Sequence, residues 1–135
     1  MSDSHTASQR ATILLAHGST DPNWLAPFDG LLDGIRAGLT TERVELAYME
    51  LAEPSLEHQV RTLVAEGFTA IDVLPLFFAA GRHLRKDVPR MLDALSEELA
   101  SNTPAELNLH PPVGLDPEVA SALSRIVLKK ITASA

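Results

Sequence analysis

The chain has no cysteine, few aromatic residues and no long apolar run, and each absence excludes a class of function. Without cysteine, this protein of 135 residues has no disulfide, thiolate zinc site or cysteine nucleophile. Any metal must therefore be held by other side chains or by backbone oxygen. Aromatic residues make up 4% of the chain, too few for a surface that stacks on bases. The longest apolar run, 73–80, contains a proline and is too short to span a bilayer.

Positive charge is also scarce. The chain has 11 Lys and Arg against 18 Asp and Glu, which gives a formal net charge of −7 at pH 7. A nucleic-acid-binding protein normally presents a basic face, so nucleic acid is not an expected partner. The first ten residues are polar and lack the apolar segment of a signal peptide. We therefore expect a soluble protein of the cytoplasm that does not associate with a membrane.

Length and apolar patterning predict one α/β domain. A disordered N-terminal tail is expected at 1–10 and a folded domain at 11–135. Short apolar runs alternate with segments whose apolar residues recur at steps of three and four. The expected strands are 11–16, 43–49, 70–78 and 106–109, and the expected helices begin near 21, 54, 87 and 116. This alternation predicts a single three-layer domain with a four-stranded parallel sheet and helices on both faces.

Several residues mark the expected helix boundaries. Asp21 and Asp116, each followed by proline, predict the starts of the first and last helices, and Asp87 is expected to cap the third. Glu53 is interpreted as a residue at the start of the second helix. In the last helix, the residues expected to face the core are Val119, Leu123, Ile126, Val127 and Ile131. A four-stranded unit is small for this architecture, so we expect a partner subunit to cover an exposed face.

Residues able to bind a metal follow three of the predicted strands. His17 follows the first strand, Glu50 ends the second, and His83 lies just beyond the third. In open parallel sheets, ligands bind beyond the carboxyl ends of the strands. Two imidazoles and one carboxylate suit a divalent cation such as Co²⁺, Fe²⁺, Ni²⁺ or Zn²⁺, and three ligands leave positions open for a substrate. The pattern predicts an open metal site of the catalytic kind.

Each of these residues also has a simpler interpretation. His17 could satisfy backbone groups in the turn after its strand. Glu50 could be an exposed carboxylate or pair with Arg82, and Glu53 is a competing carboxylate. His83 could belong to a solvated basic loop. The positions of these residues in the sequence are compatible with these interpretations as well as with a metal site.

Two further interpretations of the first strand end are weaker. The turn at Gly18 and Ser19 could cradle a phosphate at a helix N-terminus, but the GxGxxG pattern and the Walker lysine are absent. Ser19 could act as a nucleophile beside His17, but no GxSxG pattern surrounds it. His58 is expected to be a surface residue. His110 is expected at the surface end of its strand, with an approach to the site as the alternative.

Three separated segments resemble the motifs of small tetrapyrrole chelatases. They read LLAHGSTDP at 14–22, YMELAEPSLEHQV at 48–60 and VLPLFFAAGRHLRKDVP at 73–89. Their order and spacing resemble those of the short CbiX-type sirohydrochlorin chelatases and the related sirohydrochlorin ferrochelatases. The resemblance extends from residue 11 to the last helix. It implies a half-size version of the two-domain chelatase fold that pairs as a homodimer.

The resemblance also implies a reaction. It implies insertion of Co²⁺, Fe²⁺ or Ni²⁺ into sirohydrochlorin in cobalamin or siroheme biosynthesis, with no cofactor beyond this metal substrate. His17 and His83 match the family's metal-binding histidines, and Glu50 matches the glutamate of its F-L-E-L segment. The family often has arginine after HGS, where this chain has Thr20, so one contact to a substrate carboxylate is in doubt. Two alternatives are a metal or tetrapyrrole carrier without turnover and a phosphate-binding regulatory domain.

Side chains near His83 are expected to bind the substrate that the resemblance implies. Sirohydrochlorin carries many carboxylates, and a basic cluster next to His83 has the matching charge. That cluster consists of Arg82, Arg85, Lys86 and Arg90, and Ser19 is expected to add a polar contact. One of two adjacent phenylalanines must face the core, because alternate strand residues point to opposite faces. The apolar residues expected to line the cleft are Leu76, Phe77, Phe78 and Leu84.

Overall fold

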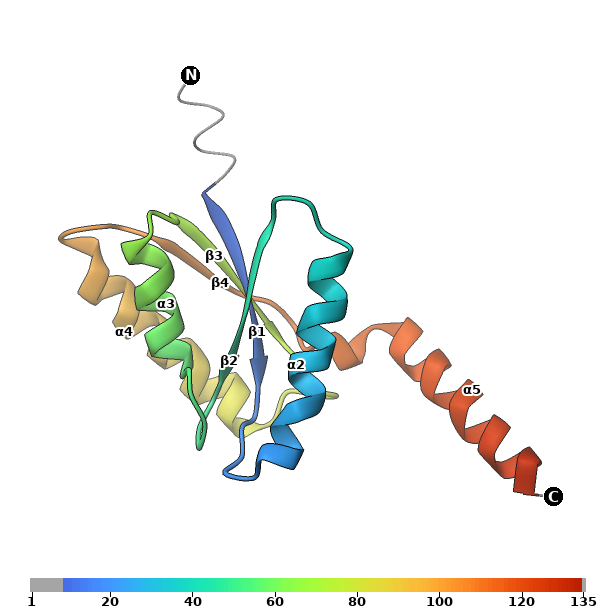
Figure 1. The fold of residues 1–135 in the computed structure, drawn as a ribbon. Coiled ribbons are helices and arrows are strands. Elements are labelled where there is room, and N and C mark those ends of the chain that lie inside the picture. Colours follow the sequence, from blue (N-terminus) through green and yellow to red (C-terminus); the bar gives the residue numbers. More distant parts are fainter. Residues whose placement is uncertain (1–8, 135) are drawn as a thin grey trace.

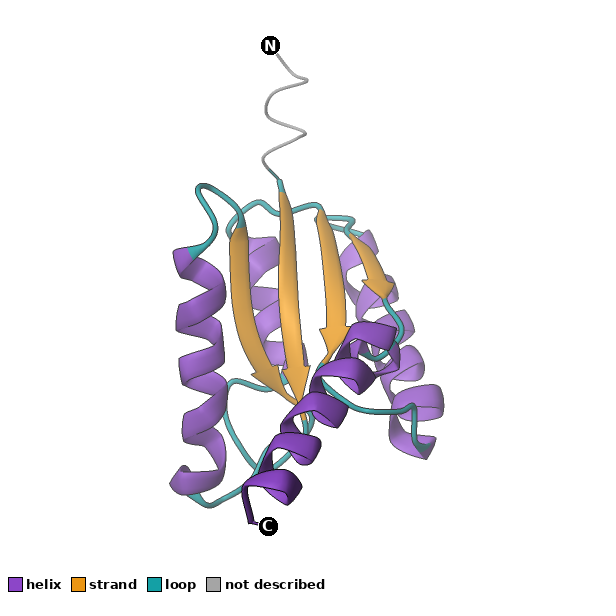
Figure 2. Ribbon diagram, turned by 90° about the vertical axis from the view of Figure 1, so that its right-hand side faces the viewer, coloured by secondary structure: helices purple, strands orange, loops and turns teal. Residues whose placement is uncertain are grey.

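Four parallel strands form the central sheet. A computed structural model describes residues 9–134, and of His83 and Ser134 it describes only the backbone. The strand order is β2-β1-β3-β4. The strands are β1 (Arg10–Ala16), β2 (Arg43–Tyr48), β3 (Ala70–Pro75) and β4 (Glu106–Leu109). All pairs are parallel, so the carboxyl ends of the strands meet at one edge of the sheet (Figure 2).

Helices cover both faces of the sheet, which confirms the predicted fold class. Helix α2 lies on one face, and α3 and α4 lie on the other (Figure 1). The helices are α2 (Pro22–Ala37), α3 (Leu56–Ala65), α4 (Val88–Ala100) and α5 (Pro117–Ser134). Two short turns, the π-helix η1 (His83–Asp87) and the 3₁₀ helix η2 (Val113–Leu115), follow β3 and β4. None of the described helices combines the length and apolar character needed to cross a membrane.

The apolar run of β1 is buried because β1 has a helical layer on each side. Ile13 and Leu15 pack in the core beneath α3 and α4. Leu14 and Ala16 point the other way and pack in a second core beneath α2. A continuous apolar run in place of an alternating one is typical of a central parallel strand covered on both faces.

The first strand begins earlier than the sequence predicted. Arg10 was expected in the tail, but it starts β1 and pairs with Ala70 of β3. Its guanidinium lies 2.7 Å from a carboxylate oxygen of Asp72, and this ion pair extends the strand. Residues 1–8 of the predicted tail lie outside the described part of the chain.

Two helix starts follow the predicted capping chemistry. Asp21 accepts a hydrogen bond from the backbone N–H of Asn23 at 2.9 Å at the start of α2. Asp116 accepts one from the N–H of Glu118 at 2.9 Å at the start of α5. Each carboxylate satisfies one of the free N–H groups of the first helical turn.

At the other two predicted helix starts, the capping chemistry differs from the prediction. Ser55, and not Glu53, caps α3, because the Ser55 hydroxyl accepts a hydrogen bond from the His58 N–H at 3.1 Å. Asp87 has helical backbone angles and makes no side-chain capping bond, because η1 runs directly into α4. The segment between β3 and α4 therefore ends in a π-helical turn.

The apolar face of α5 does not reach the core of its own chain. Figure 1 shows α5 extending away from the sheet. The prediction that this helix packs inward was wrong for Leu123, Ile126, Val127 and Ile131, which are exposed, while Val119 is half-buried. The sequence pattern identified the apolar stripe correctly, but a stripe does not specify which surface covers it.

Candidate functional site

His17 lies in a turn at the carboxyl edge of the sheet, as expected. Its carbonyl oxygen accepts a hydrogen bond from the Glu50 N–H at 3.2 Å, so the ends of β1 and β2 stay joined beyond the sheet. Gly18 follows with φ +99°, and a Cβ atom there would lie 1.8 Å from the Glu50 carbonyl oxygen. Only glycine fits this close, left-handed turn. The backbone therefore places two of the predicted metal ligands side by side.

The imidazole of His17 stacks on the ring of Phe77. The ring centroids are 4.0 Å apart and the planes differ by 16°. Phe77 is 7% exposed and belongs to the core beneath α3 and α4, whereas His17 is exposed. The sequence indicated that either Phe77 or Phe78 is a core residue, and the structure assigns that role to Phe77.

Glu50 lies in an exposed turn after β2. Its neighbour Leu51 has φ 64°, a left-handed conformation that is uncommon for a branched side chain. Tyr48, two residues before Glu50, is buried. Desolvation, followed by the negative charge of Asp29, raises the pKa of the Tyr48 hydroxyl, which therefore stays neutral. Glu50 and Glu53 are both exposed in this segment. Glu50 is the one whose backbone bonds to the His17 turn.

His83 starts the π-helical turn η1, on the far side of β1 from Glu50 in the strand order. The backbone N–H of Arg85 donates to the Gly81 carbonyl at 3.0 Å, so a hydrogen-bonded turn that begins before His83 leads into η1. A π-helical turn is rare and is often found at functional sites. The His83 side chain lies outside the described part of the structure. Among the side chains that are described, no three His, Cys, Asp or Glu residues come together as a metal site.

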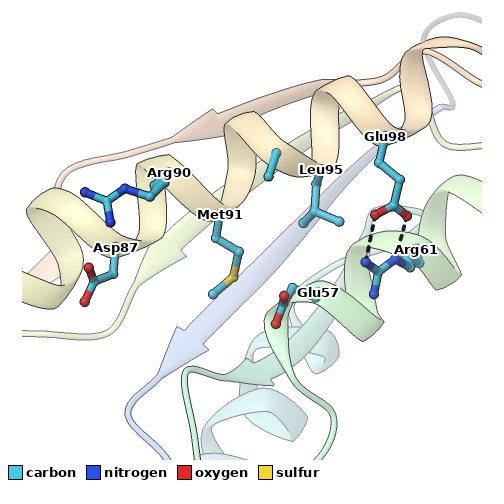
Figure 3. Close-up of a pocket in the computed structure, with 8 residues that line it drawn as sticks. Glu57, Arg61, Asp87, Arg90, Met91, Leu95 and Glu98 are labelled. Atoms are coloured by element: carbon cyan, nitrogen blue, oxygen red, sulfur yellow. Dashed lines mark hydrogen bonds and ion pairs between the residues drawn. The ribbon is translucent and has the colours of Figure 1, made fainter.

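The basic residues beside His83 lie around η1 and in the first turn of α4. Arg82, Arg85 and Lys86 are exposed around η1, and none of them forms an ion pair with a described residue. Arg90 instead lines a hollow of about 280 Å³ between α3 and α4, together with Glu57 and Met91 (Figure 3). In Figure 3 the Arg90 side chain runs along α4 toward Asp87, so Arg90 borders both this hollow and the end of η1.

Three of the four apolar residues expected to line a cleft border one hollow of the structure. Phe78 is 68% exposed, whereas Leu84 is buried in the core. An apolar hollow of about 240 Å³ lies beside α2. It is lined by Phe28, Leu31, Leu76, Phe77, Phe78, Val113, Gly114 and Val119. The sequence patterns did not indicate this hollow, because its lining comes from segments far apart in the chain.

Three further polar residues were singled out in the sequence. Ser19 accepts a hydrogen bond from the Asp21 N–H at 3.0 Å and so shapes the turn that leads into α2. His58 is exposed, as expected. His110 was expected on the surface, and although it is exposed, its Nε2 lies 3.1 Å from Asp72 Oδ1.

Asp72 is the acceptor of a polar cluster on β3 and β4. Partial burial tends to raise its pKa. The hydrogen bonds from Arg10, His110 and Asn108, with the charge of Arg10, outweigh burial and leave the pKa of Asp72 below its usual range. The cluster stabilises the strand pairing and contains none of the three predicted metal ligands.

Solved structures of other proteins share this fold. A CbiX protein from Marinobacter aquaeolei VT8 is 38% identical, with a TM-score of 0.79 over 92% of this chain and 98% of the other. SirB from Bacillus subtilis, solved with Fe³⁺, is 25% identical, with a TM-score of 0.73 over 87% of this chain and 45% of the other. These likenesses define the class as a chelatase-type α/β protein with one parallel sheet.

The sequence comparisons assign the family. The sirohydrochlorin cobaltochelatase of Saccharolobus solfataricus is 30% identical over 118 residues, which cover 85% of this chain and 91% of that protein. The sequence profile of the CbiX family matches residues 11–129. The chain belongs to the CbiX family, which confirms the resemblance noted in the three motifs.

Proposed function

We propose that the protein is a chelatase that inserts a divalent metal into sirohydrochlorin. The observation that carries the proposal is the His17 turn, where an exposed imidazole lies at the carboxyl edge of the sheet beside the backbone of Glu50. The relatives support the reaction, since the Saccharolobus protein is named a sirohydrochlorin cobaltochelatase. Co²⁺ is accordingly the first metal to test, with Fe²⁺ and Ni²⁺ as the other candidates. No cofactor besides this metal substrate is proposed.

The proposed metal ligands are His17, Glu50 and His83. They follow β1, β2 and β3, and β1 lies between the other two strands in the sheet. Two imidazole nitrogens and a carboxylate oxygen suit borderline divalent ions. Three ligands leave coordination positions for water and then for the ring nitrogens of the substrate. Such a site is able to release its metal, which a closed four-ligand site is not.

The insertion reaction exchanges protons for a metal ion. The metal loses its water ligands and protein ligands while two N–H protons leave the macrocycle, so M²⁺ enters and two H⁺ depart. An imidazole that has given up the metal can take a proton near neutral pH, and so can a carboxylate to a lesser extent. Glu50 serves either as a third ligand or as the proton acceptor.

Local positive charge is proposed to bind the substrate carboxylates. The whole chain carries a formal charge of −7, so attraction must come from particular residues. Arg82, Arg85 and Lys86 are exposed around η1 and have no ion-pair partner among the described residues. Ser19 is proposed as a further polar contact, because its hydroxyl hydrogen is not used in the bond that it accepts from Asp21.

A homodimer is part of the proposal. Leu123, Ile126 and Val127 are 43%, 50% and 50% exposed, which leaves an apolar helix face in water. The apolar hollow beside α2, lined by Phe28 and Leu31, is also uncovered in the single chain. A second copy that brings its own α5 to this surface would cover both, and a two-fold axis would repeat the contact. The proposed location is the cytoplasm, and the proposed pathway is cobalamin or siroheme biosynthesis.

A turnover assay tests the proposal directly. Purified protein is incubated with Co²⁺ and sirohydrochlorin, both in large excess over protein, and insertion is followed by absorbance. A chelatase converts many equivalents of sirohydrochlorin per subunit. Conversion that stops at one equivalent would identify a carrier, and no acceleration over the protein-free reaction would overturn the proposal.

A further inference from the structure

We infer that Phe77 is a positioning residue for His17, a role that rests on the proposed function of His17 as a metal ligand. Phe77 is 7% exposed, and its ring lies 4.0 Å from the imidazole with a 16° angle between the planes. The two rings are close to parallel, so the face of the imidazole lies against the face of the Phe77 ring. A lone pair of imidazole nitrogen lies in the ring plane and points out through the edge. The contact therefore restrains the ring while leaving its coordinating edge free.

The backbone of His17 is fixed from the opposite side. Its carbonyl accepts the Glu50 N–H at 3.2 Å, and Gly18 packs against the Glu50 carbonyl. These contacts come from the segment after β2, whereas Phe77 comes from the segment after β3. Since the backbone is held on one side and the ring on the other, the side-chain torsions of His17 have little freedom.

Phe77 is in turn held by the segment after β4. The Gly114 N–H donates to the Phe77 carbonyl at 2.8 Å. A Cβ atom on Gly114 would lie 2.3 Å from the Phe78 Cα and 2.5 Å from the Phe77 oxygen. The η2 turn thus lies directly on the Phe77 backbone. On the other side, the Leu76 N–H donates to the Leu15 carbonyl at 2.8 Å and keeps the chain attached to β1.

A ligand that is held in its binding conformation loses less side-chain entropy when the metal arrives. We expect the loss of this restraint in Phe77→Leu to weaken Co²⁺ binding by about three- to tenfold. Phe77→Tyr keeps an aromatic face and should bind Co²⁺ nearly as well as the wild type. Leu92→Ala is the control for general destabilisation, because Leu92 is buried in the same core on α4.

The test uses the full chain and Co²⁺ alone, with affinity measured by calorimetry well below the unfolding temperature. Proton NMR of the metal-free protein should show the His17 ring protons shifted upfield by the Phe77 ring current, and this shift should vanish in Phe77→Leu. In the insertion assay, Phe77→Leu should raise the KM for Co²⁺ more than it lowers kcat. Leu92→Ala should leave the Co²⁺ affinity unchanged.

Equal Co²⁺ affinity in Phe77→Leu and wild type would overturn the inference, as would the same loss in Leu92→Ala. If Phe77→Leu does not fold, Phe77→Met is the second variant, and the wild-type NMR shift still decides whether the stack exists. The binding measurement needs no tetrapyrrole. If Co²⁺ affinity depends on Phe77 as expected but the protein inserts no Co²⁺, the proposed function is overturned and the inference stands.

Discussion

The backbone N–H of Glu50 donates to the carbonyl oxygen of His17, at 3.2 Å. This bond lies beyond the last register pair of β1 and β2, Ala16 with Tyr48. It joins two predicted metal ligands through the main chain, so the spacing of their backbones does not depend on side-chain rotamers. The backbone at the edge of the sheet is therefore shaped before any metal binds.

Gly18→Ala should destabilise the protein strongly. The new methyl group would need a left-handed backbone and would meet the Glu50 carbonyl at 1.8 Å. We expect a loss of about 2–4 kcal/mol in the free energy of unfolding, measured with urea. Gly34→Ala is the matched control, because Gly34 lies in α2 with no atom within 4 Å of its would-be Cβ. It should stabilise the protein by about 0.5–1 kcal/mol, and equal effects of the two changes would contradict this account.

Asp72→Asn should destabilise the protein at neutral pH but not in acid. The pKa of Asp72 is below its usual range in the folded state, so ionised Asp72 contributes stability above the unfolded value of about 3.9. That contribution is lost as the pH falls through the lowered pKa. We expect a gap of about 1 kcal/mol between wild type and variant at pH 7 that closes toward pH 2.

Asp93→Asn is the control for this measurement, because Asp93 is exposed on α4 and forms no ion pair with a described residue. Its unfolding free energy should follow that of the wild type at each pH. A gap for Asp72→Asn that persists unchanged to pH 2 would show that the ion pair with Arg10 is not its source.

Val127→Asp should weaken self-association. Val127 is 50% exposed on the apolar face of α5, where a charge would oppose burial against a second copy. We expect the wild type to sediment as a dimer at micromolar concentration and the variant to dissociate at least about tenfold more readily. Ser121→Asp adds the same charge on the other side of α5 and should stay dimeric. A monomeric wild type would contradict the proposed homodimer.

Glu50→Gln should slow insertion of Co²⁺ by about 100-fold, whichever role the carboxylate has. The Co²⁺ affinity then separates the roles, since a lost ligand weakens binding and a lost proton acceptor does not. Glu53→Gln is the control, because Glu53 accepts a hydrogen bond from the Ser55 N–H at 3.2 Å in the turn before α3. An insertion rate for Glu50→Gln equal to that of Glu53→Gln would remove Glu50 from the site.

The strands and the edge of the sheet could be predicted because they follow from local patterns. The apolar run at 11–16 requires cover on both faces, and its end places His17 at the carboxyl edge. Asp21 before proline marks the start of α2 through a capping bond formed within three residues. Such signals need no knowledge of the rest of the chain.

The missed features depend on contacts between distant segments. The stack of His17 on Phe77 joins residues 60 positions apart in the chain, and no periodicity encodes it. The cluster of Arg10, Asp72 and His110 likewise forms only after β3 lies between β1 and β4. The α5 stripe was found, but whether it packs on its own chain depends on where the preceding turn directs the helix.

The most direct test of the account is Co²⁺ insertion into sirohydrochlorin by His17→Ala and His83→Ala, followed by absorbance. Both variants should lose insertion, because each removes a proposed metal ligand from the edge of the sheet. His58→Ala is the control, since His58 is exposed on α3, and it should keep the wild-type rate. Near-normal insertion by both His17→Ala and His83→Ala, with the fold intact by circular dichroism, would contradict the assignment of the metal site.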